Sequence, residues 1–160
     1  MEDKAYVGLG ANLGDREGTI RRAVELLAAT PGIEVVAVSA LRETDPVGYA
    51  DQPRFLNGVV ALETELAPRA LLERLLAVER ELGRVRGEGP RFGPRPIDLD
   101  LLVHGCEVVD EPGLVVPHPR LAERRFVLEP LHELDPELTL PDGRRIADLL
   151  RRRKIRARRR

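Results

Sequence analysis

The stretch Ile97-Asp-Leu-Asp-Leu-Leu-Val103 has the composition of a β-strand with one acidic face. Side chains two residues apart in a strand share a face. Leu99 and Leu101 are therefore expected to point into the core, and Asp98 and Asp100 to point together toward the other side. This strand is the last element in an order that predicts the fold.

Hydrophobic periodicity N-terminal to this strand predicts three further strands and two helices. A ten-residue loop with two prolines, over residues 44–53, separates two of the strands and is long enough to suggest a function. The strand–helix–strand–strand–helix–strand order is that of a split βαβ unit. We predict an α+β protein with a ferredoxin-like βαββαβ antiparallel sheet. The strands are expected at residues 5–10, 33–41, 55–66 and 97–103, and the helices at residues 16–29 and 68–83.

A C-terminal extension follows the last predicted strand. It is expected to contain a short return strand at residues 107–109, a helix in two pieces over residues 122–134, and a final helix at residues 146–152. The chain length of 160 residues fits one domain. We place this domain at residues 1–150 and treat residues 151–160 as a mobile tail.

The tail concentrates positive charge, because eight of its ten residues are Lys or Arg. Without it the chain has 18 basic and 27 acidic residues, so the remainder carries a charge near −9. A basic tail can bind nucleic acid, but this one lacks aromatic side chains that stack on bases. A solvated chain end is the simpler interpretation, and we expect no nucleic-acid partner.

The single cysteine, Cys106, cannot form an internal disulfide, so an oxidising compartment is not indicated. The sequence shows no signal peptide and no apolar stretch near the roughly 20 residues of a membrane span. We predict a cytoplasmic protein with no membrane partner.

The paired carboxylates of Asp98 and Asp100 predict a magnesium site. Two such groups repel each other unless a cation lies between them. Hard oxygen ligands select Mg²⁺, which commonly keeps water and phosphate oxygens in its shell. The alternative is a strand with an acidic solvent face. The neighbouring segment 84–96 favours the metal, because it holds four Arg among three Gly and three Pro and could bind phosphate oxygens.

Other segments suggest an aromatic acceptor. Phe55 and Asn57 could supply a stacking face and an amide for a flat heterocycle, although ordinary strand entry explains them equally well. His118, between two prolines, could donate to a phosphate or transfer a proton. Residues 8–14 fail the dinucleotide-binding glycine spacing, and the chain contains no Gly-Lys-Ser/Thr phosphate loop.

Together these segments resemble the 6-hydroxymethyl-7,8-dihydropterin pyrophosphokinase family of folate biosynthesis. The resemblance extends from about residue 4 to 150, and its most specific block is Gly93-Pro-Arg-Pro-Ile-Asp-Leu-Asp100. The other matching blocks are residues 8–14, 44–48, 51–57, 83–86, 116–120 and 124–126.

The resemblance implies that ATP donates its β,γ-pyrophosphoryl unit to the pterin hydroxymethyl oxygen and that AMP is released. It implies two Mg²⁺ ions on Asp98 and Asp100, and both substrates as small-molecule partners of what we expect to be a monomer. The implied pterin-binding residues are Thr44, Val47, Gly48, Phe55, Asn57, Arg124 and Phe126. The implied ATP-binding residues are Glu79, Arg84, Arg95, His118 and Arg124, of which Arg84, Arg95 and His118, with Asp98 and Asp100, are the expected catalytic residues.

This chain departs from some relatives in the arginine-rich segment, where Gly87-Glu-Gly89 and Phe92 stand in place of a lysine and a tryptophan. Arg86 or Arg91 could substitute for that lysine. Two alternative functions stay open: another Mg²⁺-dependent nucleotidyl- or phosphotransferase, and a nucleic-acid-binding module. AMP as a product would distinguish the pyrophosphokinase from a nucleotidyltransferase.

Overall fold

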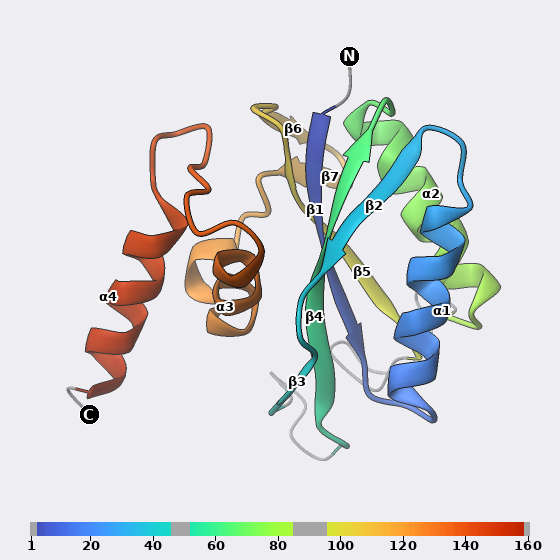
Figure 1. Cartoon of the computed structure of the whole chain (residues 1–160), viewed down its shortest axis with the longest axis horizontal. Coiled ribbons are helices and arrows are strands. Elements are labelled where there is room, and N and C mark those ends of the chain that lie inside the picture. The colour runs from blue at the N-terminus through green and yellow to red at the C-terminus, as the bar shows by residue number, and fades with distance from the viewer. Residues whose placement is uncertain (1–2, 46–51, 85–95, 159–160) are drawn as a thin grey trace.

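In a computed structural model of the chain, residues 3–45, 52–84 and 96–158 are described, with residues 153–158 as backbone alone. Helices lie on both sides of a central sheet (Figure 1). The elements are β1 (Asp3–Ala11), α1 (Arg16–Ala28), β2 (Ile33–Val38), β3 (Arg42–Thr44), β4 (Phe55–Thr64), α2 (Pro68–Glu81), β5 (Asp98–His104), β6 (Val109–Glu111), β7 (Leu114–Val116), a 3₁₀ turn (Leu121–Glu123), α3 (Arg125–Leu134) and α4 (Ile146–Arg158).

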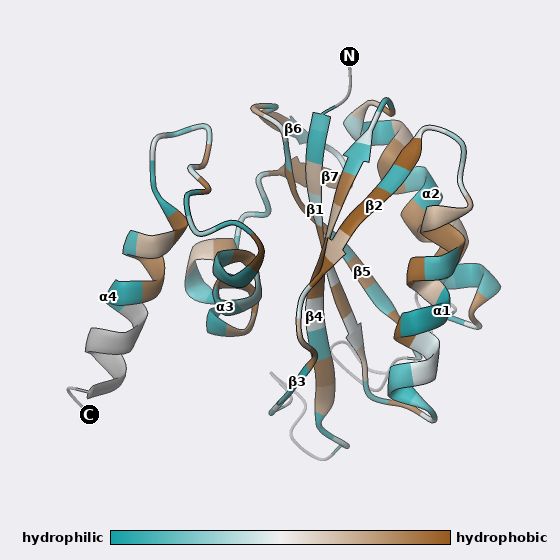
Figure 2. Cartoon of the chain, in the orientation of Figure 1, coloured by the Kyte–Doolittle hydropathy of each residue, from teal (hydrophilic) through white to brown (hydrophobic). Residues whose placement is uncertain are grey.

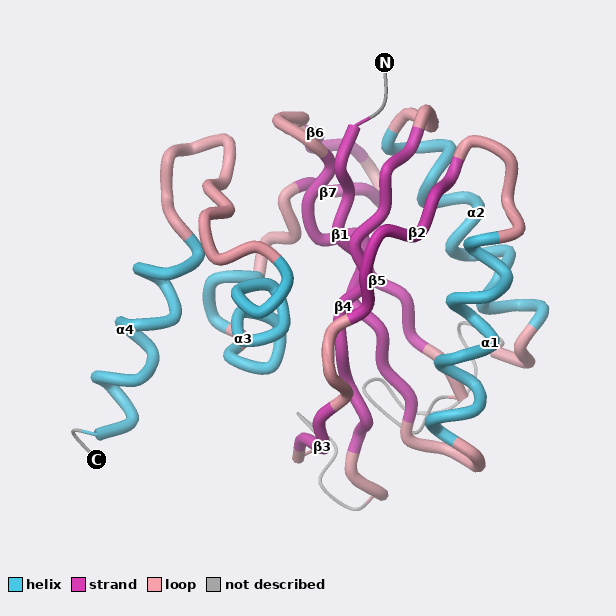
Figure 3. The backbone as a smooth tube through the Cα atoms, viewed as in Figure 1, coloured by secondary structure: helices cyan, strands magenta, loops and turns pink. Residues whose placement is uncertain are grey.

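The sheet is antiparallel, with strand order β2-β4-β1-β5 and β3 paired to β4. Strands cross the middle of the molecule, with α1 and α2 on one side and α3 and α4 on the other (Figures 1 and 3). The strands β6 and β7 form a separate two-stranded hairpin. The predicted mixture of helices and an antiparallel sheet is therefore confirmed.

Alternation along the strands builds a hydrophobic core on each face of the sheet. Val7 and Leu9 of β1 belong to the core under α1 and α2, and Tyr6 of the same strand belongs to the core under α3 and α4. Leu99 and Leu101 are 2% and 5% exposed, as expected for core residues. Apolar residues recur along the strands and on the helices that pack against them (Figure 2).

The helix starts follow from local chemistry. Asp15 accepts the Gly18 amide at 3.1 Å, which satisfies one of the unpaired donors at the start of α1. Pro68 is the first residue of α2, where its missing N–H removes no helical hydrogen bond. Gly83, just after α2, has φ of +92°, a conformation that glycine adopts without steric cost.

Several predicted boundaries were wrong. The strand expected at residues 33–41 ends at Val38, and a separate strand, β3, begins at Arg42; between them the Ser39 hydroxyl accepts the Val59 amide at 2.9 Å. The return strand expected at 107–109 lies at Val109–Glu111 instead. The final helix does not end at residue 152, and α4 continues to Arg158.

The helix expected in two pieces is interrupted at Arg124, and Pro130 lies inside α3. None of the described helices combines the length and the apolar composition needed to cross a lipid bilayer.

Candidate functional site

The floor of the candidate site is the face of the sheet toward α3, where two glycines of β1 lie between functional side chains. Gly10 pairs with Asn57 of β4 on one side and with Asp98 of β5 on the other. Gly8 pairs with Asp100 in the next row along β5. Side chains of directly paired residues share a face. The floor between the amide and the two carboxylates is therefore bare backbone.

A pocket of about 230 Å³ lies above this floor. Its walls come from the sheet, from the segment before α3, and from the first turn of α3. Both carboxylates of the β5 pair reach it, as the alternation predicted. The lining residues are Gly8, Leu9, Gly10, Thr44, Asp45, Phe55, Asn57, Gly58, Arg84, Asp98, Asp100, Leu102, His118, Arg124, Phe126 and Val127.

Arg84 connects the carboxylate pair to the end of α2. Its Nη1 donates to Asp98 Oδ1 at 2.6 Å, to Glu79 Oε2 at 3.0 Å and to the Ile97 carbonyl oxygen at 3.2 Å. Arg84 and Glu79 are 9% and 1% exposed. The same Glu79 oxygen accepts the Leu99 amide at 2.8 Å. The buried glutamate therefore holds the guanidinium in place beside Asp98.

The ligands that β5 offers suit Mg²⁺. Asp98 and Asp100 present hard carboxylate oxygens toward the pocket, and the Asp98 side chain is 20% exposed. Across the described part of the chain, no three His, Cys, Asp or Glu residues cluster closely enough to form a metal site by themselves. An ion held by this pair would complete its shell with water and phosphate oxygens, which is usual for Mg²⁺.

His118 reaches the pocket from the segment that follows β7. Its amide donates to the Leu102 carbonyl at 2.9 Å, which ties the segment to β5. Burial lowers the pKa of His118 below its ordinary value, the positive charges of Arg124 and Arg120 lower it further, and Asp98 opposes them. Because Nδ1 accepts the Arg120 amide at 3.1 Å, the neutral ring carries its proton on Nε2. His118 can therefore donate a hydrogen bond near neutral pH.

Aromatic and amide groups occupy the other end of the pocket. The Asn57 amide nitrogen donates to the Thr44 hydroxyl, which joins β4 to β3. Phe55 of β4 and Phe126 of α3 both line the pocket. The Arg124 guanidinium lies 5.6 Å from the centre of the Phe126 ring, within range of a cation–π interaction. This end offers stacking faces and an amide, which is what a flat heterocycle requires.

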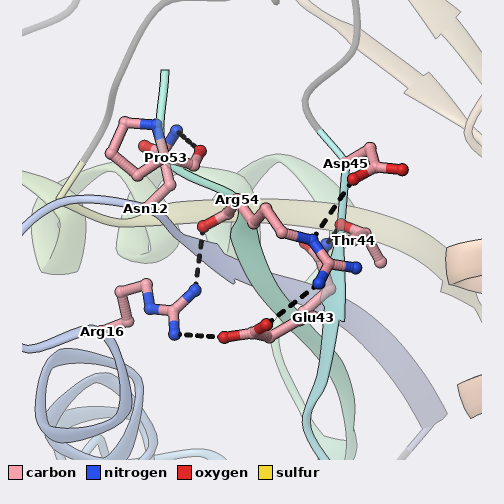
Figure 4. Close-up of polar contacts among 8 residues, drawn as sticks. Asn12, Arg16, Glu43, Thr44, Asp45, Pro53 and Arg54 are labelled. Carbon is pink, nitrogen blue, oxygen red and sulfur yellow. Dashed lines mark hydrogen bonds and ion pairs between the residues drawn. The ribbon is translucent and has the colours of Figure 1, made fainter. Parts of the chain in front are cut away.

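A polar network fixes the strand ends next to the pocket (Figure 4). Arg16 of α1 donates to the Arg54 carbonyl at 2.9 Å and forms an ion pair with Glu43 at 2.7 Å. Arg54 forms ion pairs with Glu43 and Asp45, each at 3.2 Å. Asn12, 1% exposed, donates to the Pro53 carbonyl at 3.0 Å. These contacts hold β3 and the start of β4 against α1 and β1.

Most of the residues predicted for the site reach one pocket. Glu79 does not line it and acts through Arg84. Val47, Gly48 and Arg95 lie outside the described residues. The predicted residues that line the pocket are Thr44, Phe55, Asn57, Arg84, Asp98, Asp100, His118, Arg124 and Phe126.

The pocket residues that were not predicted as parts of the site include Gly8 and Gly10. Their spacing of two residues in a predicted strand was the available signal, since it places both on one face. Residues 8–14 were interpreted as a failed dinucleotide-binding motif, so the spacing of the glycines was not recognised as part of a site. Arg16 and Glu43 were also missed, because contacts between distant segments carry no local pattern.

An antiparallel sheet that presents paired carboxylates, arginines and a histidine beside an aromatic recess is typical of enzymes that transfer phosphate-containing groups to a ring-bearing acceptor. The chain matches the family described as 7,8-dihydro-6-hydroxymethylpterin-pyrophosphokinase (HPPK) over residues 6–136. The chain belongs to this family.

Curated relatives match this chain along most of their length. The chain is 49% identical over 150 residues to a 2-amino-4-hydroxy-6-hydroxymethyldihydropteridine pyrophosphokinase of Pseudomonas aeruginosa, covering 94% of this chain and 91% of the relative. Proteins of the same name from Methylorubrum extorquens and Bacillus subtilis are 53% and 49% identical over 138 and 134 residues, covering 86% and 84% of this chain and 85% and 79% of theirs.

Solved structures share the fold at low sequence identity. A wild-type Plasmodium falciparum HPPK-DHPS with pterin and p-hydroxybenzoate superposes with a TM-score of 0.76 at 15% identity, covering 99% of this chain and 44% of that one. An HPPK-DHPS in complex with substrates gives a TM-score of 0.72 at 13% identity, covering 94% and 43%. The chain thus spans less than half the length of these larger proteins.

Proposed function

We propose that the pocket on the α3 side of the sheet is the active site in which a pyrophosphoryl group passes from ATP to the hydroxymethyl group of 7,8-dihydro-6-hydroxymethylpterin. Members of the family are diphosphate-group transferases of folate biosynthesis with ATP as co-substrate. The observation that carries the proposal is the pairing of Gly10 with Asn57 on one side and Asp98 on the other. It supports an acceptor end and a phosphate end on one continuous floor.

At the acceptor end, the ring would stack between Phe55 and Phe126 and hydrogen-bond to Asn57, with Thr44 orienting the amide. Val47 and Gly48, assigned by family resemblance, would complete this pocket. The ring's hydroxymethyl group would then extend across Gly10 toward the phosphates.

At the phosphate end, Asp98 and Asp100 would hold Mg²⁺, two ions by family resemblance. Bound Mg²⁺ would neutralise phosphate charge and align the attacking and leaving oxygens. Arg84, Arg95 and Arg124 would bind phosphate oxygens, and His118 would donate to them through Nε2. Glu79 would keep Arg84 oriented.

The hydroxymethyl oxygen would form a bond to the β-phosphorus of ATP while the bridging bond to AMP breaks, and the hydroxyl proton would be lost to solvent. The protein aligns these groups and offsets charge, and no covalent intermediate with the chain is expected.

Sheet order and composition support three finer proposals. The order β2-β4-β1-β5 supports a ferredoxin-like arrangement, with β6 to α4 as its C-terminal extension. Expected cytoplasmic location rests on the single cysteine. A monomer with the 1–150 domain and a mobile tail at 151–160 stays a prediction, testable by light scattering and by truncation at residue 150.

The function is tested by AMP formation from Mg²⁺, ATP and the hydroxymethyl dihydropterin. Asp98→Asn and Asp100→Asn should each abolish turnover while circular dichroism shows an intact fold. As a matched control, Asp110→Asn on the exposed hairpin strand β6 should turn over like the wild type. Near-normal turnover by either β5 variant would show that the metal assignment is wrong, and free pyrophosphate as the product would favour a nucleotidyltransferase.

A further inference from the structure

Gly10 lies where a side chain would meet the Asn57 amide. A Cβ atom built on Gly10 would lie 2.8 Å from Asn57 Oδ1, and 3.9 Å from both Asp98 Cβ and Phe55 Cδ1. The contact at 2.8 Å is shorter than van der Waals separation allows. An added methyl group would therefore force the Asn57 amide to move.

Backbone conformation does not require glycine at this position. The φ angles of Gly8 and Gly10 lie outside the left-handed region in which glycines such as Gly14 are found. Alanine could adopt either strand conformation, so the requirement at Gly10 is for space.

Asn57 can move only by losing its orientation. Its amide nitrogen donates to Thr44, and this bond aims Oδ1 over Gly10. Among the described residues, no donor forms a hydrogen bond with Oδ1, so this oxygen is available to a donor on a bound ring. Rotation away from a Gly10 methyl group would break the bond to Thr44 and withdraw the acceptor.

Gly10 also lies midway along the path between the two ends of the site. Adjacent strands are about 4.8 Å apart, so Asn57 and Asp98 are separated by about 9.6 Å across β1. A fused two-ring heterocycle with a short hydroxymethyl arm could reach from the Asn57 amide toward Asp98 across this span.

We infer that Gly10 is a positioning residue for the flat acceptor, because it leaves room for the Asn57 amide in the orientation that receives the ring. The inference rests on the proposed function, because it assumes that the acceptor binds at Asn57. Gly8 provides a comparison on the same floor. A Cβ atom there would lie 3.7 Å from Asp100 Cβ and from the Leu102 methyl groups, which is ordinary contact.

The test compares Gly10→Ala with Gly8→Ala, using titration calorimetry of the hydroxymethyl dihydropterin with Mg²⁺ and a non-hydrolysable ATP analogue, and steady-state kinetics. We expect Gly10→Ala to weaken pterin binding by at least about tenfold, the value of one lost hydrogen bond. The KM for the pterin should rise and the KM for ATP should change less than twofold. Gly8→Ala, whose added methyl group would make only ordinary contacts, should raise the KM for the pterin by a smaller factor than Gly10→Ala does.

A double-mutant cycle with Asn57→Ala identifies the route of the effect. Without the amide there is nothing for the methyl group to displace, so adding Gly10→Ala to Asn57→Ala should weaken pterin binding less than threefold. If Gly10→Ala costs the same factor in both backgrounds, or if it binds pterin like the wild type, the inference is wrong. If the wild-type protein binds no pterin, the proposed function itself fails.

A folding defect in Gly10→Ala is also informative. Restoration of the fold in the Gly10→Ala/Asn57→Ala double variant would support the clash with Asn57. A double variant that stays unfolded while Asn57→Ala alone folds would overturn the inference, because the methyl group would then be excluded by something other than the amide.

Discussion

Replacement of Arg84 by methionine should destabilise the protein through the buried Glu79 that it leaves behind. Removal of one partner of a buried ion pair costs about 3–5 kcal/mol, because the other charge stays buried with one partner fewer. The cost should lie at the lower end of this range, because Glu79 keeps its hydrogen bond from the Leu99 amide at 2.8 Å. In addition, the Asp98 side chain is 20% exposed and can be hydrated by water. We expect a loss of about 3 kcal/mol in the free energy of unfolding.

Urea denaturation and thermal melting measure this loss. For a chain of this length, about 3 kcal/mol corresponds to a melting temperature lower by roughly 6–12 °C. The double variant Glu79→Gln/Arg84→Met should recover about 2 kcal/mol, because a neutral amide still accepts the Leu99 N–H and no buried charge remains.

Arg69→Met is the matched control, since Arg69 forms a 2.6 Å ion pair with Glu111 at the surface, where both side chains are more than 40% exposed. It should cost no more than about 1 kcal/mol. The reasoning is refuted if Arg84→Met lies within 1 kcal/mol of the wild type, or if the double variant is less stable than the single one.

Two further predictions concern single side chains. Because burial and Arg124 lower the pKa of His118, NMR titration should find its midpoint below about 6.5. The neutral ring stabilises the fold above the unfolded pKa, and this stability is lost as pH falls through the folded pKa. His118→Gln should reduce the loss of stability at low pH. Tyr6→Phe removes the 2.8 Å hydrogen bond from the buried hydroxyl to Asp135 and should lower the free energy of unfolding by about 1 kcal/mol in urea titrations, whereas an unchanged midpoint would show that the bond contributes nothing.

Much of the site was predictable where chemistry follows strand alternation. The alternation of side chains along a strand predicted Asp98 and Asp100 on one face and Leu99 in the core. In the structure both carboxylates line the pocket and Leu99 is buried. Boundaries were less predictable, because β2 ends just before Ser39, whose hydroxyl is hydrogen-bonded to Val59, twenty residues away. The helix expected over residues 122–134 does continue through Pro130, where tertiary packing overrides the local preference of proline.

Contacts between distant segments explain why the arginine and the glycines were harder to interpret than the carboxylates. Arg84 is adjacent to a segment that looks like a solvated loop, yet it is buried because Glu79 and the Ile97 carbonyl lie within reach of its Nη1. Gly10 contributes to the site by what it lacks, and the spacing of the two glycines can be interpreted only once Asn57 is known to lie beside Gly10. The bare floor and the paired carboxylates follow from the same alternation, because Gly8 and Gly10 pair with Asp100 and Asp98 on one face of the sheet.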